Sequence, residues 1–120
     1  MKRMAWALSV LALAAVPLSV ADDCARWRAA FARMPSGAIT IVVGNRHVPL
    51  KVKVPSDQEQ FAAGFQCATR AEIERTNILF DFGHEIAVPF HMQNVAAPLD
   101  IAFAKTDGTI FSIQRMKPFR

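Results

Sequence analysis

The stretch LDIAFAKTDGTIFSIQRM, residues 99–116, decides how the chain folds. Its two halves alternate between apolar and other residues, and Asp107 and Gly108 lie between them. An Asp-Gly pair between two alternating runs is a strong signal for a β-hairpin. Because strand side chains point alternately to opposite faces, one set of residues in the first run shares a core-facing side. This set is Leu99, Ile101 and Phe103.

Immediately upstream, the segment FHMQN, residues 90–94, mixes polar side chains into an apolar run that begins at Ala87. This run predicts a strand on which Asn94 shares a face with the apolar residues, while His91 and Gln93 point the other way. A buried amide must be paired, usually with backbone groups. Asn94 and Asp100 therefore have two interpretations: they hold the connection between two strands in shape, or they belong to a binding site.

Nearer the N-terminus, apolar residues at helical spacing predict a helix that starts at an Asp cap and ends before Pro35. The β-branched runs 38–43 and 48–54 then predict a hairpin with one solvent-facing side. Ser56 and Glu59 have the spacing of a capping box, which predicts a short helix beginning near Asp57.

A second box, Thr69 with Glu72, predicts one or two further helical turns, and residues 77–82 read as another strand. These elements together predict an α+β fold, mainly antiparallel β in a small barrel-like sheet, with an N-terminal helix and one or two short helices. There is no repeat, low-complexity segment or linker, so we expect a single domain over residues 22–120.

The first 21 residues have the features of a secretory signal peptide. Lys2 and Arg3 precede an apolar run, residues 5–16, which is too short to span a membrane. Small residues before Asp22 indicate cleavage after Ala21; the alternative is an uncleaved anchor. We expect a periplasmic or secreted protein with no membrane span after cleavage.

The charge balance argues against a nucleic-acid partner. The chain has 14 Lys and Arg against 10 Asp and Glu, and removal of the signal peptide takes away two of the positive charges. The remaining basic residues are scattered singly, whereas phosphate backbones are bound by a basic stripe or patch.

Both cysteines, Cys24 and Cys67, lie in the predicted mature chain. Export to an oxidising compartment allows them to pair in a disulfide. Two free thiols are the alternative. A zinc site is disfavoured because the wide spacing matches no zinc pattern.

The order of these segments resembles the family catalogued as domain of unknown function 192, over about residues 39–118. In that family a helix ends in a glycine motif, a strand reads Met-Leu-Phe-x-Phe, and a later segment reads Phe-Trp-Met-x-Asn-Thr-x-x-Pro-Leu-Asp. The residues that match this pattern are Gly64, Leu79, Phe80, Phe82, Phe90, Met92, Asn94, Pro98, Leu99, Asp100, Phe103, Asp107 and Gly108.

Three positions depart from the family pattern: His91 replaces Trp, Val95 replaces Thr, and Gln66 replaces Met. Members of the family generally continue beyond the point that Lys117 occupies here, so the resemblance suggests a C-terminally short domain. It implies a compact, mainly antiparallel β fold and no established reaction.

The residues proposed for a ligand-binding site are His84, His91, Gln93, Asn94 and Asp100. A histidine beside a carboxylate can act as a general base, so a small hydrolase using His91 and Asp100 is the enzymatic alternative. However, no serine or cysteine stands in a nucleophile motif and no glycine-rich phosphate loop is present. A binding module for a small ligand or a cell-envelope protein is therefore the favoured interpretation.

No cofactor fingerprint is present, and no metal site is predicted. The three histidines and Glu85 offer suitable ligand atoms, but the separation of His84 and His91 is no recognised metal spacing. Aromatic side chains at the surface would suit a sugar ring or a peptide, and core packing is the alternative for each; the candidates are Trp27, Phe90, Phe111 and Phe119. An open sheet edge would also allow a homodimer.

Overall fold

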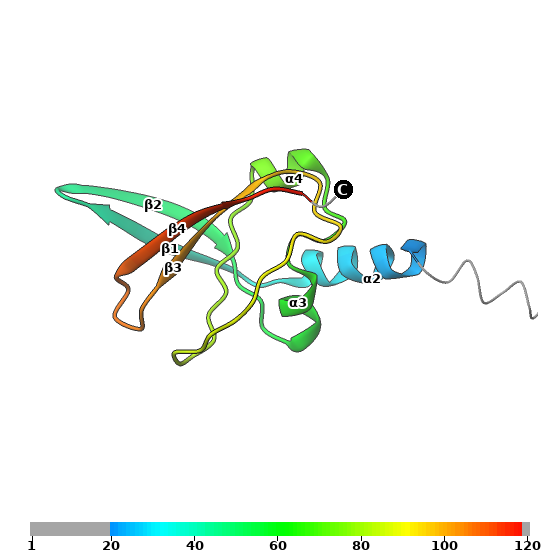
Figure 1. The fold of residues 1–120 in the computed structure, drawn as a ribbon, viewed down its shortest axis with the longest axis horizontal. Helices are drawn as coiled ribbons and strands as arrows, with labels where there is room; N and C mark the ends of the chain where they lie inside the picture. The colour runs from blue at the N-terminus through cyan, green and yellow to red at the C-terminus, as the bar shows by residue number, and fades with distance from the viewer. Residues whose placement is uncertain (1–19, 119–120) are drawn as a thin grey trace, which may run out of the picture.

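The computed structural model describes residues 20–118. The predicted signal peptide therefore lies almost entirely outside the described residues, and so does Phe119. Over residues 20–118, the fold consists of two β-hairpins and three helices (Figure 1). The α+β class with mainly antiparallel strands is confirmed. The barrel-like sheet is wrong, because the hairpins form two separate two-stranded sheets instead of one continuous sheet.

Helix α2, Val20–Arg33, is followed directly by the first hairpin, in which β1, Ser36–Val43, pairs antiparallel with β2, Arg46–Lys53. Along β2 the burial alternates as the sequence predicts, and Val52 is its most buried residue. The helix includes Asp22 and Asp23, so the prediction that an aspartate caps its N-terminus is wrong.

Two short helices follow. Helix α3, Gln58–Ala63, begins after Asp57, whose side chain accepts a hydrogen bond from the backbone N–H of Gln60 at 2.8 Å. Asp57 therefore caps the helix, and the predicted box of Ser56 with Glu59 does not form. Helix α4, Arg70–Glu74, has the predicted capping box of Thr69 and Glu72.

The second hairpin contains β3, Leu99–Ala104, and β4, Ile110–Met116, paired antiparallel with an irregularity after Phe103. Gly108 has a φ of 92°, and the side chain of Asp107 accepts the N–H of Thr109 at 2.9 Å. This contact lowers the pKa of Asp107 below its usual value. The predicted hairpin and its turn are thus confirmed, as is the core-facing side of β3.

The two strands predicted between α4 and β3 do not form. Within residues 77–82, only Ile78 bridges to β2. Lys53 donates its backbone N–H to the carbonyl of Asn77 and accepts the N–H of Leu79, the two residues that flank Ile78. Pro55 has no N–H to continue the ladder, so the pairing stops there. Residues 87–92 are irregular, and Pro89 removes a ladder hydrogen bond in the middle of the run.

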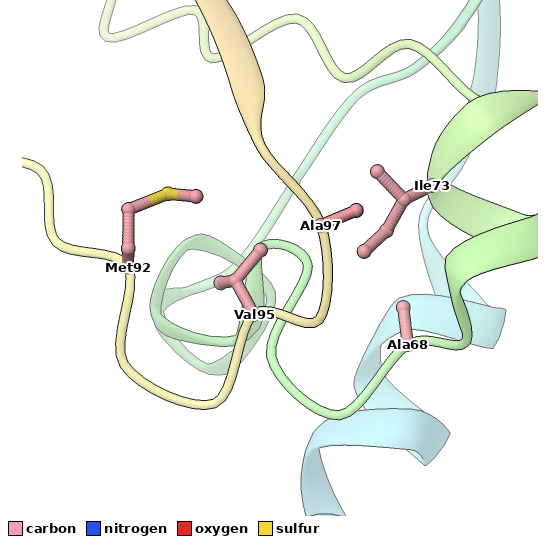
Figure 2. Close-up of a cluster of buried hydrophobic side chains, with 5 residues drawn as sticks. All are labelled: Ala68, Ile73, Met92, Val95 and Ala97. Atoms are coloured by element: carbon pink, nitrogen blue, oxygen red, sulfur yellow. The ribbon is translucent and has the colours of Figure 1, made fainter. Parts of the chain in front are cut away.

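Two small hydrophobic clusters form the core. One joins α2 to α3 through Ala30, Phe31, Met34 and Ala63. The other joins α4 to the segment before β3, and its buried residues are Ala68, Ile73, Met92, Val95 and Ala97 (Figure 2). Phe65 packs against both clusters, so it links the helical part of the core to the second hairpin.

Candidate functional site

The polar segment, residues 90–94, ends in a turn, and the side chain of Asn94 makes a hydrogen bond there to Gln66. Val95 donates its N–H to the carbonyl of Met92 at 3.1 Å, and Asn94 adopts a left-handed φ of 61°. The side-chain amide of Asn94 donates to Oε1 of Gln66 at 3.1 Å. Gln66 is buried, so this contact satisfies an acceptor that would otherwise lie unpaired in the interior.

All the predicted site residues are exposed, Asn94 among them, so the prediction that Asn94 shares a face with the buried apolar residues is wrong. His91 accepts the backbone N–H of Gln93 on its Nδ1 at 3.2 Å, within the same turn. Asp100 accepts from Nη1 of Arg115 at 2.7 Å on the outer side of the second hairpin. His84 lies exposed in the loop before the polar segment.

No hydrogen bond among residues 20–118 joins His84 or His91 to Asp100. A general base needs hydrogen-bond reach to its partners, so the described geometry offers no His-Asp pair to support the enzymatic alternative. Nor does any group of three His, Cys, Asp or Glu side chains in this part of the chain lie close enough to hold a metal ion.

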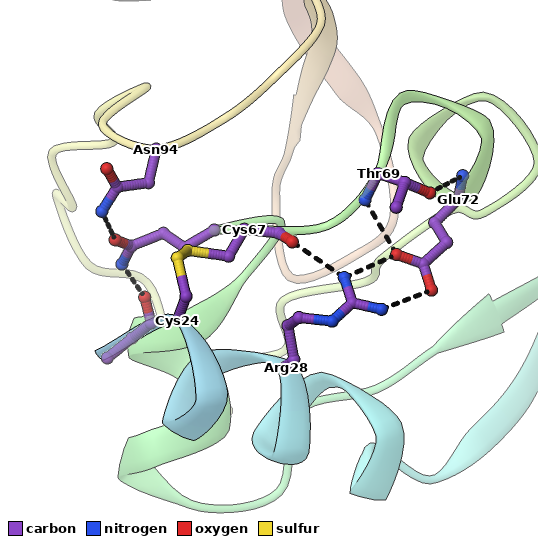
Figure 3. Close-up of a disulfide and its surroundings, with 8 residues drawn as sticks. Cys24, Arg28, Cys67, Thr69, Glu72 and Asn94 are labelled. Atoms are coloured by element: carbon purple, nitrogen blue, oxygen red, sulfur yellow. Dashed lines mark hydrogen bonds and ion pairs between the residues drawn. A yellow bond between two sulfur atoms is a disulfide. The ribbon is translucent and has the colours of Figure 1, made fainter. Parts of the chain in front are cut away.

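The disulfide between Cys24 and Cys67 forms, with the two Cα atoms 5.4 Å apart, and it ties α2 to the turn between α3 and α4 (Figure 3). Cys67 has a left-handed φ of 62° and donates its N–H to the carbonyl of Asn94 at 2.8 Å. The bridge, the buried amide of Gln66 and the polar segment are therefore one connected unit.

Arg28 lies one helical turn beyond Cys24, on the same side of α2 (Figure 3). Its Nη1 donates to the carbonyl of Cys67 at 2.8 Å and to Oε1 of Glu72 at 3.0 Å, while Nη2 lies 3.4 Å from Oε2 of Glu72. The backbone N–H of Thr69, followed by the guanidinium of Arg28, lowers the pKa of Glu72. Glu72 is therefore ionised at neutral pH and its charge is balanced by Arg28.

Beside this contact is a pocket of about 370 Å³ between α2, the end of β2 and the C-terminal end of α4. We call it the basic pocket, and it is lined by Arg28, Phe31, Ala32, Lys53, Glu72, Arg75 and Thr76. The lining therefore includes three cationic side chains, Arg28, Lys53 and Arg75, and one carboxylate, that of Glu72. Neither Lys53 nor Arg75 makes an ion pair with any other described residue.

Lys53 contacts Phe31, and both residues line the pocket. Its Nζ donates to the carbonyl of Phe31 at 3.3 Å and lies 4.8 Å from the centroid of the Phe31 ring. An ammonium group has three donors, so two of those on Lys53 are available for another acceptor. The pocket therefore has a net positive charge, which suits an anionic ligand.

Sequence reasoning missed the basic pocket because its cations come from three separate elements. Arg28, Lys53 and Arg75 each stand alone in the sequence, so no basic stripe was visible. The one available signal was the i, i+4 relation of Cys24 and Arg28, which places both on the same side of a helix.

Within residues 20–118, no helix has the length and apolar character needed to cross a membrane. No curated protein and no solved structure shows significant similarity to the chain. One family model does match, over residues 39–120, which is more than half of the chain. The chain therefore belongs to the family DUF192, described as "Uncharacterized ACR, COG1430".

Proposed function

We propose that this protein is an exported binding module whose basic pocket takes a small anionic ligand, through a carboxylate or phosphate group. The single observation that carries the proposal is the gathering of Arg28, Lys53 and Arg75 around one pocket with only Glu72 to balance them. Charged hydrogen bonds to an anion are stronger than neutral ones.

Two features support export. The N-terminal segment has the basic start, apolar run and small-residue cleavage site of a signal peptide. A disulfide such as Cys24–Cys67 persists in an oxidising compartment. If the full chain is expressed and the envelope fraction is collected, we expect the purified protein to begin at Asp22 by mass spectrometry. Recovery of the intact 120-residue chain from the cytoplasm alone would contradict export.

Ligand binding is tested by calorimetric titration with two probes at constant ionic strength, inorganic phosphate and the dicarboxylate glutarate. We expect one of them to bind, and whichever binds identifies a phosphoryl or a carboxylate ligand. Lys53→Met or Arg75→Ala removes one charged contact, so each should weaken that affinity at least about tenfold.

Matched controls remove the same charge outside the pocket. Lys51→Met changes a neighbouring lysine on the same strand, and Arg70→Ala changes an arginine of α4 that pairs with Glu74 instead. Both should bind like the original protein, as should Asp100→Asn. If Lys51→Met and Arg70→Ala weakened the affinity as much as the pocket variants do, the cause would be the overall charge of the protein. If only Asp100→Asn lost binding, the site would lie at the polar segment. If neither probe bound, the proposal would be rejected.

A further inference from the structure

The Cys24–Cys67 bridge connects two sides of the basic pocket that belong to different parts of the core. Helix α2 packs with α3 in one hydrophobic cluster, whereas α4 packs with the segment before β3 in the other. Among residues 23–118, only Arg28 joins α2 to Cys67 and to α4 by hydrogen bonds. The bridge and the guanidinium of Arg28 therefore hold α2 directly against the turn before α4 and against α4 itself (Figure 3).

Arg28 depends on the bridge for its position. It lies one helical turn after Cys24, on the same side of α2, and its Nη1 donates to the carbonyl of Cys67 at 2.8 Å. Its side chain is 46% exposed, and an ion pair with an exposed member contributes little to stability. Without the S–S bond, only these exposed contacts would hold Arg28 against Glu72.

The other two cations of the pocket do not depend on the bridge. Lys53 is joined to the residues that follow α4 by two backbone hydrogen bonds, from its N–H to the carbonyl of Asn77 at 2.8 Å and from the N–H of Leu79 to its carbonyl at 2.9 Å. Arg75 lies two residues before Asn77. A chain without the bridge would therefore keep both cations in place beside Glu72.

The charge of the pocket would then change. With the bridge, three cations line the pocket with one carboxylate, and Arg28 balances the charge of Glu72. Without Arg28, two cations remain and the carboxylate has lost its partner. A carboxylate in this position repels an incoming anion and competes with it for the remaining cations.

From these contacts we propose that the Cys24–Cys67 bridge is a redox switch for the basic pocket. The oxidised protein holds Arg28 in place and binds the anion, whereas the reduced protein binds it weakly. The inference rests on the proposed function, because it concerns the same pocket. It also implies that a chain made in a reducing compartment becomes able to bind its ligand only after export to an oxidising one.

The reaction at the bridge is thiol–disulfide exchange. Cys24 and Cys67 are each only partly buried, so the bridge lies outside the closed core. A thiolate of a dithiol reductant attacks one sulfur, the S–S bond breaks and a mixed disulfide forms, which the second thiol of the reductant then resolves. Two electrons and two protons pass to the protein, which gains two thiols, while the reductant becomes a disulfide. Oxidation by a protein disulfide reverses these steps.

The switch is tested by calorimetric titration of the oxidised protein and of protein reduced beforehand with dithiothreitol. The probe is whichever of inorganic phosphate and glutarate binds the oxidised protein. We expect reduction to weaken the affinity about tenfold, which corresponds to the loss of one charged contact. Arg28→Gln should bind weakly in both redox states, because the group that the bridge positions is gone.

Arg26→Gln is the matched control. It removes an arginine of the same helix that pairs with Glu59 instead, and it should keep the full response to reduction. Circular dichroism should show that the reduced protein is still folded. Unfolding of the whole chain on reduction would overturn a local switch, and so would an equal effect of reduction on Arg28→Gln and on the original protein.

The switch and the proposed function fail in different ways. If the oxidised protein binds one of the probes and reduction leaves its affinity unchanged, the switch is rejected and the binding function stands. If the oxidised protein binds neither probe, both are rejected.

Discussion

Cys67 donates its backbone N–H to the carbonyl of Asn94 at 2.8 Å, and each of the two residues occupies the third position of a hydrogen-bonded turn. They have φ values of 62° and 61° and are the only non-glycine residues in the described part of the chain with a positive φ. The turn that carries the disulfide and the turn of the polar segment thus support each other. Asparagine adopts the left-handed conformation more readily than most residues, which explains its presence at position 94.

The left-handed backbone of Asn94 predicts a contrast between two substitutions. Asn94→Ala and Asn94→Gly both lose the hydrogen bond to Gln66, but alanine also pays about 1–2 kcal/mol for the left-handed conformation, which glycine adopts freely. We therefore expect urea unfolding to show a larger loss of stability for Asn94→Ala than for Asn94→Gly. Equal losses would show that the backbone conformation contributes little.

The disulfide predicts a large change in the free energy of unfolding. Cys24 and Cys67 are 43 residues apart, and closing a loop of this length in the unfolded chain is worth about 4 kcal/mol in the chain-entropy model. The double variant Cys24→Ser/Cys67→Ser should lose stability of this order in urea unfolding. Thiol titration of unfolded protein should find no free thiol before reduction and two afterwards; two free thiols before reduction would show that the bridge does not form.

The depressed pKa of Glu72 predicts how stability depends on pH. The folded pKa lies below the ordinary value of 4.5, so the stabilisation is complete above that pH and is lost as the pH falls through the folded pKa. Urea unfolding midpoints should therefore fall on acidification, and Glu72→Gln should flatten that part of the curve. Its amide oxygen can still accept from Thr69, which keeps the helix cap.

Glu74→Gln is the control for this pH effect. It removes the same charge from the same helix, but Glu74 pairs with Arg70 where both side chains are more than 60% exposed. Exposed pairs contribute little to stability. If Glu74→Gln flattened the curve as much as Glu72→Gln does, the contact with Arg28 would not be the cause.

Local signals predicted the elements whose stabilising contacts are close in sequence. Asp107 and Gly108 supply the turn that β3 and β4 need, and the box of Thr69 and Glu72 satisfies the first N–H groups of α4 within a few residues. The same reasoning failed for residues 77–82 and 87–92, since a strand also requires a partner with free backbone groups. Pro55 and Pro89 restrict that pairing where the apolar pattern suggested it would continue.

In the candidate site too, local patterns in the sequence were informative and contacts between distant residues were not visible. The sequence singled out Asn94 correctly as a special residue, but its contact with Gln66 crosses 28 positions and follows no local pattern. The basic pocket was not visible at all, because Arg28, Lys53 and Arg75 are brought together only by the packing of α2, β2 and α4.

By itself, therefore, the sequence determined the hairpins, the short helices and the family, because period, turn chemistry and capping act over a few residues. Tertiary structure alone decided that the hairpins remain separate sheets and that three scattered cations share one pocket. These outcomes depend on which distant segments lie side by side, and that is set by the burial of the two hydrophobic clusters and the Cys24–Cys67 bridge.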